Sequence, residues 1–554
     1  MVTGRQQHLN QALLRIPRRA ENSARHTVSK TYVEAGSFAA LLHSSDHQIL
    51  YGRRGTGKTH ALLHLSDLLA GMGDVAVYVD LRTIGSAGGI HADSAQTAAE
   101  RGTQLLIDTL EEVHDGLLAV AMEREVSERS LRSDHQSGRT SPSDHQSGRN
   151  LPSDHQSGRS DQHYDPTALL RELDALAEAA TTVKVVGEVE RETTFAGEAE
   201  TTQSAGVTLS ASPGVRASAS SKRSVSAQSR LLRTGVERHQ VMFGPLSRAV
   251  RGIVRALAPA RLWLLLDEWS SVPRDLQPFL ADLLRRAVLP VGGLTVKIAA
   301  IERRSRFAAP TATGGYVGIE VGSDAASSVD LDEFLVFDNS AARAREFFAR
   351  LFHNHTAVWL ATMVRDPPSD VTGFVDEYFS RTAFTELVRA AEGVPRDAIN
   401  IAALAAQHAH DKPITVADVR RAARDWYLRD KQTAIRGHED ARAALRALVD
   451  EVVGHRRART FVVDQLAVER AGVVEDLHDA RLLHLLRRGI ADPNHPGALY
   501  DGFAIDYGCY VSLLLDDAKF HARGKGDWLN SPAGVPPEGF KFARAAIDLG
   551  ALLG

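Results

Sequence analysis

A short apolar strand, a glycine-rich loop and a helix follow one another near the N-terminus and most constrain the fold of this chain. After Ile49 and Leu50, the loop reads Gly52-Arg53-Arg54-Gly55-Thr56-Gly57-Lys58-Thr59, and His60 starts a helical pattern. Glycines let backbone N–H groups surround a phosphate chain, and the helix N-terminus adds the positive end of its dipole. In this context the spacing G-x-x-x-x-G-K-T predicts a P-loop, with residues 52–60 contacting a nucleotide. Lys58 is expected at the terminal phosphates and the Thr59 hydroxyl on Mg²⁺.

Two adjacent acids at the end of a later strand predict the second half of the same site. The apolar run 261–266 ends at Asp267 and Glu268. Asp267 is expected to hold the Mg²⁺ shell, and Glu268 to polarise a water for attack on the γ-phosphate. This acidic pair is typical of hydrolysing ATPases rather than P-loop kinases or small GTPases, and the guanine-reading pattern N-K-x-D is absent. The sequence therefore predicts an enzyme that hydrolyses ATP, with ATP and Mg²⁺ as its ligands.

Arginines in two later segments are further candidates. The strand predicted over 294–301 leads into Glu302-Arg303-Arg304-Ser305-Arg306, where an arginine is either a finger towards a neighbouring subunit's nucleotide or part of a solvated helix start. Later, Gly393-Val394-Pro395-Arg396-Asp397 opens a helix. An arginine at such a position in a small helical lid can reach the γ-phosphate. Arg396 is therefore a catalytic candidate beside Lys58, Asp267 and Glu268.

Together, these motifs resemble those of AAA+ ATPases of the origin-recognition, replication-initiator class. G-R-R-G-T-G-K-T is similar to the Walker A motif of that class, L-L-L-D-E to its Walker B motif, and G-V-P-R-D-A-I-N to its sensor-2 helix. The resemblance covers roughly residues 35–90 and 245–430. It implies a three-layer α/β core with a parallel sheet, a helical lid that carries Arg396 as the sensor-2 arginine, and a nucleotide held between core and lid. The chain departs from the class at sensor 1, where Glu302 or a neighbour replaces the usual Asn or Thr, and in a long insertion before Walker B.

Composition narrows the class of protein further. The chain has 554 residues, too many for one hydrophobic core, and 43% of them are apolar. No apolar run is long enough to span a bilayer and the polar N-terminus lacks a secretion signal, so we expect a cytoplasmic protein without a membrane partner. The single cysteine, Cys509, excludes internal disulfides, fits a reducing compartment and is expected in a buried strand. With a net charge of −4, any contact with nucleic acid must use a local basic patch.

Residues 123–240 read as an insertion into the core. Ser133-Asp134-His135-Gln136-Ser137-Gly138-Arg139 recurs at 143–149 and 153–159. The repeat is either a hydrated linker without apolar residues to bury, which we favour, or a histidine array for metal through His135, His145 and His155. Further on, alternating residues around Pro213-Gly214 predict a β-hairpin arm outside the main sheet.

The C-terminal region has the outline of a winged helix. Helices are predicted over 442–453 and 474–489, a turn over 494–497, and two strands within 498–513. Such a domain follows the lid in the AAA+ class named above, and winged helices bind DNA or pack against protein. The candidates for contact with DNA phosphates are Arg456, Arg457, Arg459, Arg481, Arg487 and Arg488.

These patterns predict an N-terminal arm (1–45), a core (46–122 and 241–340), the insertion (123–240), a helical lid (341–436) and a winged-helix-like α+β domain (437–554). The leading hypothesis is an AAA+-like ATPase that couples nucleotide state to conformational change and self-association, with DNA as its partner. The alternative is a signalling switch NTPase, for example in bacterial host defence, whose insertion or C-terminal domain binds a protein. An inactive ATP-binding scaffold agrees less well with intact Lys58, Asp267 and Glu268.

Overall fold

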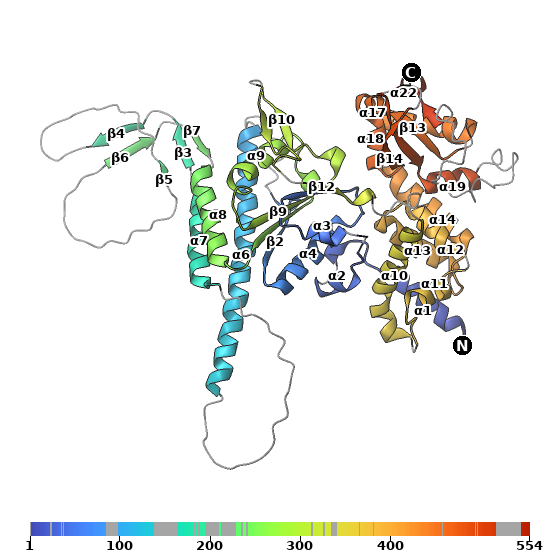
Figure 1. Cartoon of the computed structure of the whole chain (residues 1–554), viewed down its shortest axis with the longest axis horizontal. Coiled ribbons are helices and arrows are strands. Elements are labelled where there is room, and N and C mark those ends of the chain that lie inside the picture. The colour runs from blue at the N-terminus through green and yellow to red at the C-terminus, as the bar shows by residue number, and fades with distance from the viewer. Residues whose placement is uncertain are drawn as a thin grey trace, which may run out of the picture.

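A five-stranded parallel sheet forms the centre of the first half of the chain in the computed structural model (Figure 1). Its strands are β1 (Gln48–Tyr51), β2 (Val75–Asp80), β8 (Leu262–Asp267), β9 (Leu294–Ala300) and β12 (Ser327–Asp330). They lie in the order β12-β1-β9-β8-β2, and every neighbouring pair is parallel. This arrangement confirms the predicted P-loop, AAA+-like α/β fold. The sequence missed β12, because Ser-Ser-Val-Asp has too few apolar residues to indicate a strand.

Helices cover both faces of this sheet, so that the core has three layers. Successive strand residues point to opposite faces, and β8 is buried at every position, so both of its faces must be covered. On one face, Trp263 and Leu265 pack with α3 (Phe38–Leu42) and α4 (Lys58–Met72). On the other, Leu264 and Leu266 pack with α6 (Ala98–Ser137), α7 (Pro166–Ala180), α8 (Phe243–Leu257) and α9 (Gln277–Ala287).

The structure describes residues 2–84, 98–137, 164–180, 242–516 and 545–553, together with strand segments between 183 and 239. Short gaps lie at 23–24, 35, 37, 312–313, 325–326, 334–340, 365, 381, 457, 493–494 and 496. His145, His155 and the predicted turn at Pro213-Gly214 fall outside the described residues. Helix α6 continues to Ser137, so the first copy of the repeat begins in a helix and not in a linker.

Short antiparallel strands of the insertion form sheets of their own. β3 (Val183–Val186) pairs with β5 (Ser210–Ala211) and β7 (Val236–His239), and β4 (Val189–Thr193) pairs with β6 (Ser229–Arg233). In Figure 1 these strands project beyond α7 and α8. A β arm outside the main sheet was predicted, but its main ladder joins 183–193 to 229–239, a pairing that the sequence did not indicate. A further hairpin, β10 (Ala308–Pro310) and β11 (Tyr316–Gly318), packs on α9.

The lid consists of helices that follow the sheet: α10 (Ala341–Met363), α11 (Val371–Tyr378), α12 (Ala383–Ala391), α13 (Pro395–Ala409) and α14 (Val416–Trp426). Pro395 stands at the start of α13, where its missing N–H costs no hydrogen bond. The N-terminal arm is more helical than predicted. Its first helix, α1 (Val2–Leu14), buries Leu9 and Leu13 against α10 and α13, and α2 (Arg25–Thr31) packs on α4.

The C-terminal region is an α+β unit with a four-stranded sheet of order β14-β15-β13-β16. A π-helical turn, η5 (Tyr427–Lys431), and α15 (Gln432–Ala434) connect it to the lid. It contains α16 (Glu439–Leu448), the π-helical turn η6 (Val449–His455), β13 (Thr460–Asp464), α17 (Gln465–Ala471), α18 (Val473–Asp479), β14 (Leu483–Ala491), β15 (Leu499–Ile505), α19 (Tyr507–Asp516), β16 (Ala546–Ile547) and α22 (Leu549–Leu553). The order of elements before α19 is thus a helix, a strand, two helices and a two-stranded hairpin.

Two local predictions in this unit are wrong. Residues 483–489, predicted as helix, begin β14, whose Leu483 and Leu485 pair with β15. Cys509, predicted in a strand, lies in α19, although it is buried as expected. Both segments are short and largely apolar, so the spacing of apolar residues does not distinguish helix from strand there.

One hydrophobic core joins the lid to the C-terminal unit. Buried side chains of α1, α13, α14, α16, α18 and α19 form a single cluster, whereas the central sheet has two clusters of its own. The lid, α1 and the C-terminal unit therefore pack as one body. None of the helices in the described part of the chain is long and apolar enough to cross a membrane.

Candidate nucleotide-binding site

A cavity of about 410 Å³ lies at the carboxyl ends of the strands, between the core and the lid. In open parallel sheets, ligands bind at this edge. The segments that follow four strands meet there: the P-loop after β1, Arg82 after β2, Glu268 after β8 and Ile301 after β9. The lid adds Leu351, His355, Pro395, Arg396 and Ile399. The fold thus brings Lys58, Thr59, Glu268 and Arg396, all predicted site residues, to one cavity.

The P-loop runs from β1 into α4. Gly55 and Gly57 have φ values of 89° and 101°, in the left-handed region that favours glycine. Lys58 Nζ donates to the carbonyl oxygens of Gly52 (2.6 Å) and Arg53 (3.1 Å). Burial lowers the pKa of Lys58, and the nearby Asp267 carboxylate opposes this effect. The residues of the loop that line the cavity are Arg54, Gly55, Gly57, Lys58, Thr59 and His60.

The other predicted P-loop contacts are directed elsewhere. Thr56 Oγ1 donates to the carbonyl oxygen of Arg53 (2.9 Å), inside the loop. Gly52 and Arg53 line a separate, small cavity on the side of the C-terminal unit. The Arg53 side chain is buried, and its Nε lies 3.0 Å from Asp332 Oδ1. In this arrangement the Arg53 side chain therefore points away from the cavity in which a nucleotide contact was predicted for it.

Arg396 reaches the P-loop from the first turn of α13. Its backbone N–H donates to the carbonyl oxygen of Gly55 (3.2 Å), and a Cβ built on Gly55 would lie 2.7 Å from the Cβ of Arg396. Burial lowers the pKa of the Arg396 guanidinium, and the positive charges of Arg481 and Arg19 lower it further. An anion in the cavity would relieve this unfavourable burial of positive charge.

Asp267 and Glu268 end β8 in different surroundings. Asp267 is buried, and its carboxylate accepts hydrogen bonds from the Tyr78 hydroxyl (2.8 Å) and from the backbone N–H of Glu268 (2.7 Å). Glu268 has a φ of 56°, a left-handed conformation that is uncommon outside glycine and concentrates at functional sites. Glu268 lines the cavity, and its Oε1 lies 3.8 Å from Arg82 Nη1. Of the two acids, Glu268 therefore lines the cavity, whereas Asp267 is buried outside its lining.

Thr59 and Asp267 carry oxygen atoms of the kind that a magnesium ion takes, and of the two only Thr59 lines the cavity. At phosphate sites, Mg²⁺ keeps several waters and takes one or two carboxylates beside phosphate oxygens. Thr59 brings a hydroxyl group to the cavity, and the Asp267 carboxylate keeps lone pairs beyond its two hydrogen bonds. Thr59 and Asp267 are therefore the residues that would hold the ion, which would neutralise phosphate charge.

Several polar residues of the cavity were missed from the sequence. They are Arg18, Arg19 and Glu21 of the N-terminal arm, Arg82 after β2, and His355 of α10. Arg82 pairs with Asp80 (2.6 Å) and with Glu21 (3.0 Å), which ties the arm to the sheet. The ring of His355 lies 6.1 Å from that of His60, and burial lowers the pKa of His355 to about 4, so that it is neutral. The run Pro17-Arg18-Arg19 was the signal available for the arm, but no local pattern marks Arg82 or His355.

The charged residues after β9 contact the C-terminal unit and not the cavity. Arg303 pairs with Glu475 and Arg304 pairs with Asp479 (2.8 Å), both on α18. Glu302 pairs with Arg488 of β14 (2.6 Å). Since Ile301 lines the cavity and residues 302–306 do not, Glu302 is not placed as sensor 1. Arg303 and Arg304 are held in ion pairs within the chain.

Most of the arginines predicted to contact DNA form ion pairs within the chain. Arg481 is buried and pairs with Asp397 and Asp430, and Arg459 is buried and pairs with Glu392. Arg456 pairs with Glu451 (2.7 Å), and Arg488 with Glu302. Arg487 is exposed, whereas Arg457 lies outside the described residues. Four of the six arginines that the sequence suggested for DNA binding therefore make contacts within the chain.

Comparisons with known proteins do not assign this chain to a family. No protein-family model matches the chain. No curated protein matches it either. A solved structure similar to this chain is the Orc1 protein of Aeropyrum pernix in complex with DNA, with 12% sequence identity over 93% of this chain and 97% of that chain, and a TM-score of 0.28. Because this TM-score is low, the fold is assigned here from the strand order and the P-loop.

Proposed function

We propose that the protein is an AAA+-like ATPase that binds ATP·Mg²⁺ between its P-loop core and its helical lid. The observation that carries this proposal is the convergence of Lys58, Thr59, Glu268 and Arg396 on one cavity of about 410 Å³. Small-molecule sites range from about 300 to 1,000 Å³. An anion is favoured there because the lining includes Lys58 and the arginines 18, 19, 54, 82 and 396.

Each site residue has a role in this proposal. Lys58 and Arg396 bind the phosphate chain and stabilise the charge that develops on it. Glu268 orients the attacking water and takes its proton. Thr59 and Asp267 would hold Mg²⁺, and Tyr78 donates a hydrogen bond to the Asp267 carboxylate. Because Arg396 belongs to the lid, a bound nucleotide would hold core and lid together.

Steady-state ATPase and nucleotide binding test this proposal. Lys58→Ala should lose binding and turnover. Glu268→Gln should retain ATP binding but lose turnover by about 10²–10⁴-fold, because its amide cannot accept the proton from water. Glu346→Gln, in an exposed ion pair on α10, is the matched control and should behave as the wild type. Normal turnover in Glu268→Gln would show that Glu268 does not activate the attacking water.

The partner is a second part of the proposal. The resemblance to the replication-initiator class and the winged-helix-like order of the C-terminal unit favour DNA, with self-association. The alternative, a switch that binds a protein, is favoured by the internal ion pairs of Arg456, Arg459, Arg481 and Arg488. Turnover stimulated by duplex DNA would favour the first. Assembly triggered by a protein and lost on deletion of 123–240 would favour the second.

A further inference from the structure

The C-terminal unit has two different interfaces with the rest of the chain. It shares a continuous apolar core with the lid, and such burial is costly to break. Its contact with the ATPase core is mainly polar, through ion pairs and a small cavity that contains Asp330, Asp332 and His478. Polar interfaces are typical of parts that move against one another. The contact with the ATPase core is therefore the one that can open.

One face of α18 and the start of the β14–β15 hairpin form this polar contact. Glu475 and Asp479 of α18 pair with Arg303 and Arg304, and His478 between them lines the small cavity. Spacings of three and four residues place these side chains on one face of the helix. Arg488 of β14 adds its pair with Glu302. This face of α18 and the start of the hairpin therefore lie against the ATPase core, whereas Arg487 and Arg488 keep exposed side chains.

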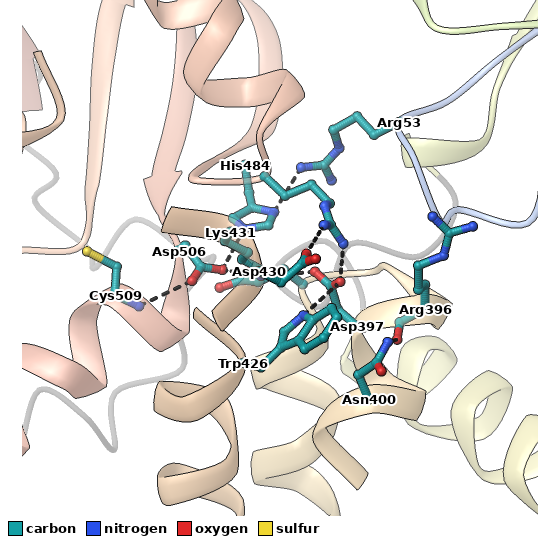
Figure 2. A network of polar contacts seen from close by, with 12 residues as sticks. Arg53, Arg396, Asp397, Asn400, Trp426, Asp430, Lys431, His484, Asp506 and Cys509 are labelled. Carbon is teal, nitrogen blue, oxygen red and sulfur yellow. Dashed lines mark hydrogen bonds and ion pairs between the residues drawn. The ribbon is translucent and has the colours of Figure 1, made fainter. Parts of the chain in front are cut away.

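Arg53 links this interface to the P-loop itself. Asp332 Oδ2 accepts from the backbone N–H of Arg53 (2.8 Å), and Asp332 Oδ1 accepts from its Nε (3.0 Å). On the other side, Arg53 Nη1 donates to His484 Nδ1 (2.9 Å) and to the carbonyl oxygen of Leu483 (3.4 Å). Both groups belong to β14. Figure 2 shows Arg53 extending from the core ribbon to His484.

Beyond His484, the network continues through buried charges back to the lid. His484 Nε2 donates to Asp506 Oδ2 (3.1 Å), which also accepts from Lys431 of η5. Lys431 Nζ lies 2.9 Å from Asp397 Oδ2, and Asp397 is the neighbour of Arg396 on α13 (Figure 2). The network therefore begins in the P-loop, crosses the C-terminal unit and ends beside the arginine that lines the cavity.

Phosphate binding would act on the first link of this network. Lys58 Nζ is hydrogen-bonded to the carbonyl oxygens of Gly52 and Arg53. A phosphate chain that engages Lys58 competes with these carbonyls for the three N–H donors of its ammonium group. The segment 52–53 then loses these two contacts and keeps those of Arg53 with Thr56 and Asp332. The same segment carries the Arg53 side chain into the interface.

We propose that Arg53 clamps the C-terminal unit onto the ATPase core, and that phosphate binding at Lys58 releases this clamp and uncovers α18 and the β14–β15 hairpin. The proposal rests on the proposed function, since it requires nucleotide at the P-loop. It assigns Arg53 a coupling role at the P-loop in place of a direct nucleotide contact. Linkage is reciprocal, so anything that binds the uncovered face would also strengthen nucleotide binding.

Hydrogen–deuterium exchange of the full chain, with and without AMP-PNP·Mg²⁺, tests the clamp. In the wild type, the analogue should raise exchange over 473–491 by at least about fivefold. In His484→Ala, exchange there should be high already, and the analogue should change it by less than about twofold. His495→Ala is the control, because His495 lies in the turn of the same hairpin with its side chain exposed, and it should respond as the wild type.

His484→Ala could act through a folding defect, so a second test exchanges the charges of the ion pair between Arg303 and Glu475. Both side chains are partly exposed, so their substitution should not disturb folding. Arg303→Glu alone should open the interface without nucleotide, and Arg303→Glu with Glu475→Arg should close it again. A fluorescent ATP analogue measures binding separately. Absence of binding would overturn the proposed function and the clamp together. Binding with unchanged or reduced exchange over 473–491 would overturn the clamp alone.

Discussion

At Gly55 the P-loop of the core lies close to Arg396 of the lid. Its φ of 89° and the 2.7 Å between its built Cβ and that of Arg396 leave no room for a side chain. Glycine is thus required there for two independent reasons, backbone conformation and contact with Arg396.

We expect Gly55→Ala to destabilise the chain by about 1–3 kcal/mol and to weaken nucleotide binding, because the left-handed backbone and the contact with Arg396 are both strained. Urea unfolding and nucleotide titration measure the two effects. Gly71→Ala is the matched control. No atom lies within 4 Å of its built Cβ in α4, so it should be neutral or stabilising by up to about 1 kcal/mol. Equal behaviour of the two variants would contradict the assignment.

Tyr78 acts on the site through Asp267. Tyr78→Phe removes the hydrogen bond that fixes the carboxylate, and partners of metal ligands typically change metal affinity or activity by about 10–100-fold. We therefore expect the Mg²⁺ concentration that gives half-maximal ATPase to rise by about that factor. Tyr316→Phe, which loses a hydrogen bond to Asp324 outside the cavity, is the control. An unchanged Mg²⁺ requirement in Tyr78→Phe would show that Asp267 needs no such support.

At the scale of elements, the π-helical turn η5 places a charge inside the shared core. Lys431 is buried between Asp397 of α13 and Asp506, which follows β15. The turn thus connects the lid to the C-terminal unit electrostatically, where the helices around it connect them by apolar packing.

Lys431→Met should cost about 3–5 kcal/mol of folding free energy, because it leaves two buried carboxylates without their shared partner. Chemical unfolding measures the loss. The control is Arg350→Met, which breaks an exposed ion pair with Glu346 and should change stability by no more than about 1 kcal/mol. A loss below about 1 kcal/mol in Lys431→Met would mean that water or rearranged partners compensate the two acids.

Elements formed by local patterns were predictable from the sequence, and those formed by distant contacts were not. The P-loop, Asp267-Glu268 and α13 each follow from a short motif beside an apolar run. In contrast, β12 has few apolar residues and forms only because β1 pairs with it. The position of Arg53 could not be predicted, because its partner His484 is 431 residues away. The arginines of the C-terminal unit were ambiguous for the same reason.

At the scale of the whole molecule, His355 at the cavity and the buried His484 make stability depend on pH. Burial lowers the pKa of His355 to about 4 and that of His484 to about 3. The ordinary value for the unfolded chain is about 6.5, so the unfolded state binds more protons below that pH. Stability is therefore full above pH 6.5 and falls as the pH is lowered towards the folded values.

Between pH 7 and pH 5, each of these histidines should cost about 2 kcal/mol. Asp330, whose pKa burial raises to about 6, acts in the opposite direction and offsets about 1 kcal/mol. Urea unfolding at the two pH values measures the sum over all such groups, including His478 and His60, whose pKa values burial also lowers. His355→Gln should reduce the loss of unfolding free energy on acidification by about 2 kcal/mol. An unchanged loss would show that His355 does not contribute to the pH dependence.

The strand order of the central sheet affects how the chain folds during its synthesis. The P-loop strand β1 has no neighbour from its own part of the chain, since Gln48 pairs with Lys297 on one side and with Ser327 on the other. During synthesis on a ribosome, β1 stays unpaired while the insertion and β8 emerge, because its partners β9 and β12 come later in the chain. Contacts of such long range are slow to form, and unpaired strands invite aggregation. The P-loop strand is synthesised early, but its pairing in the sheet is among the last parts of the core to be completed.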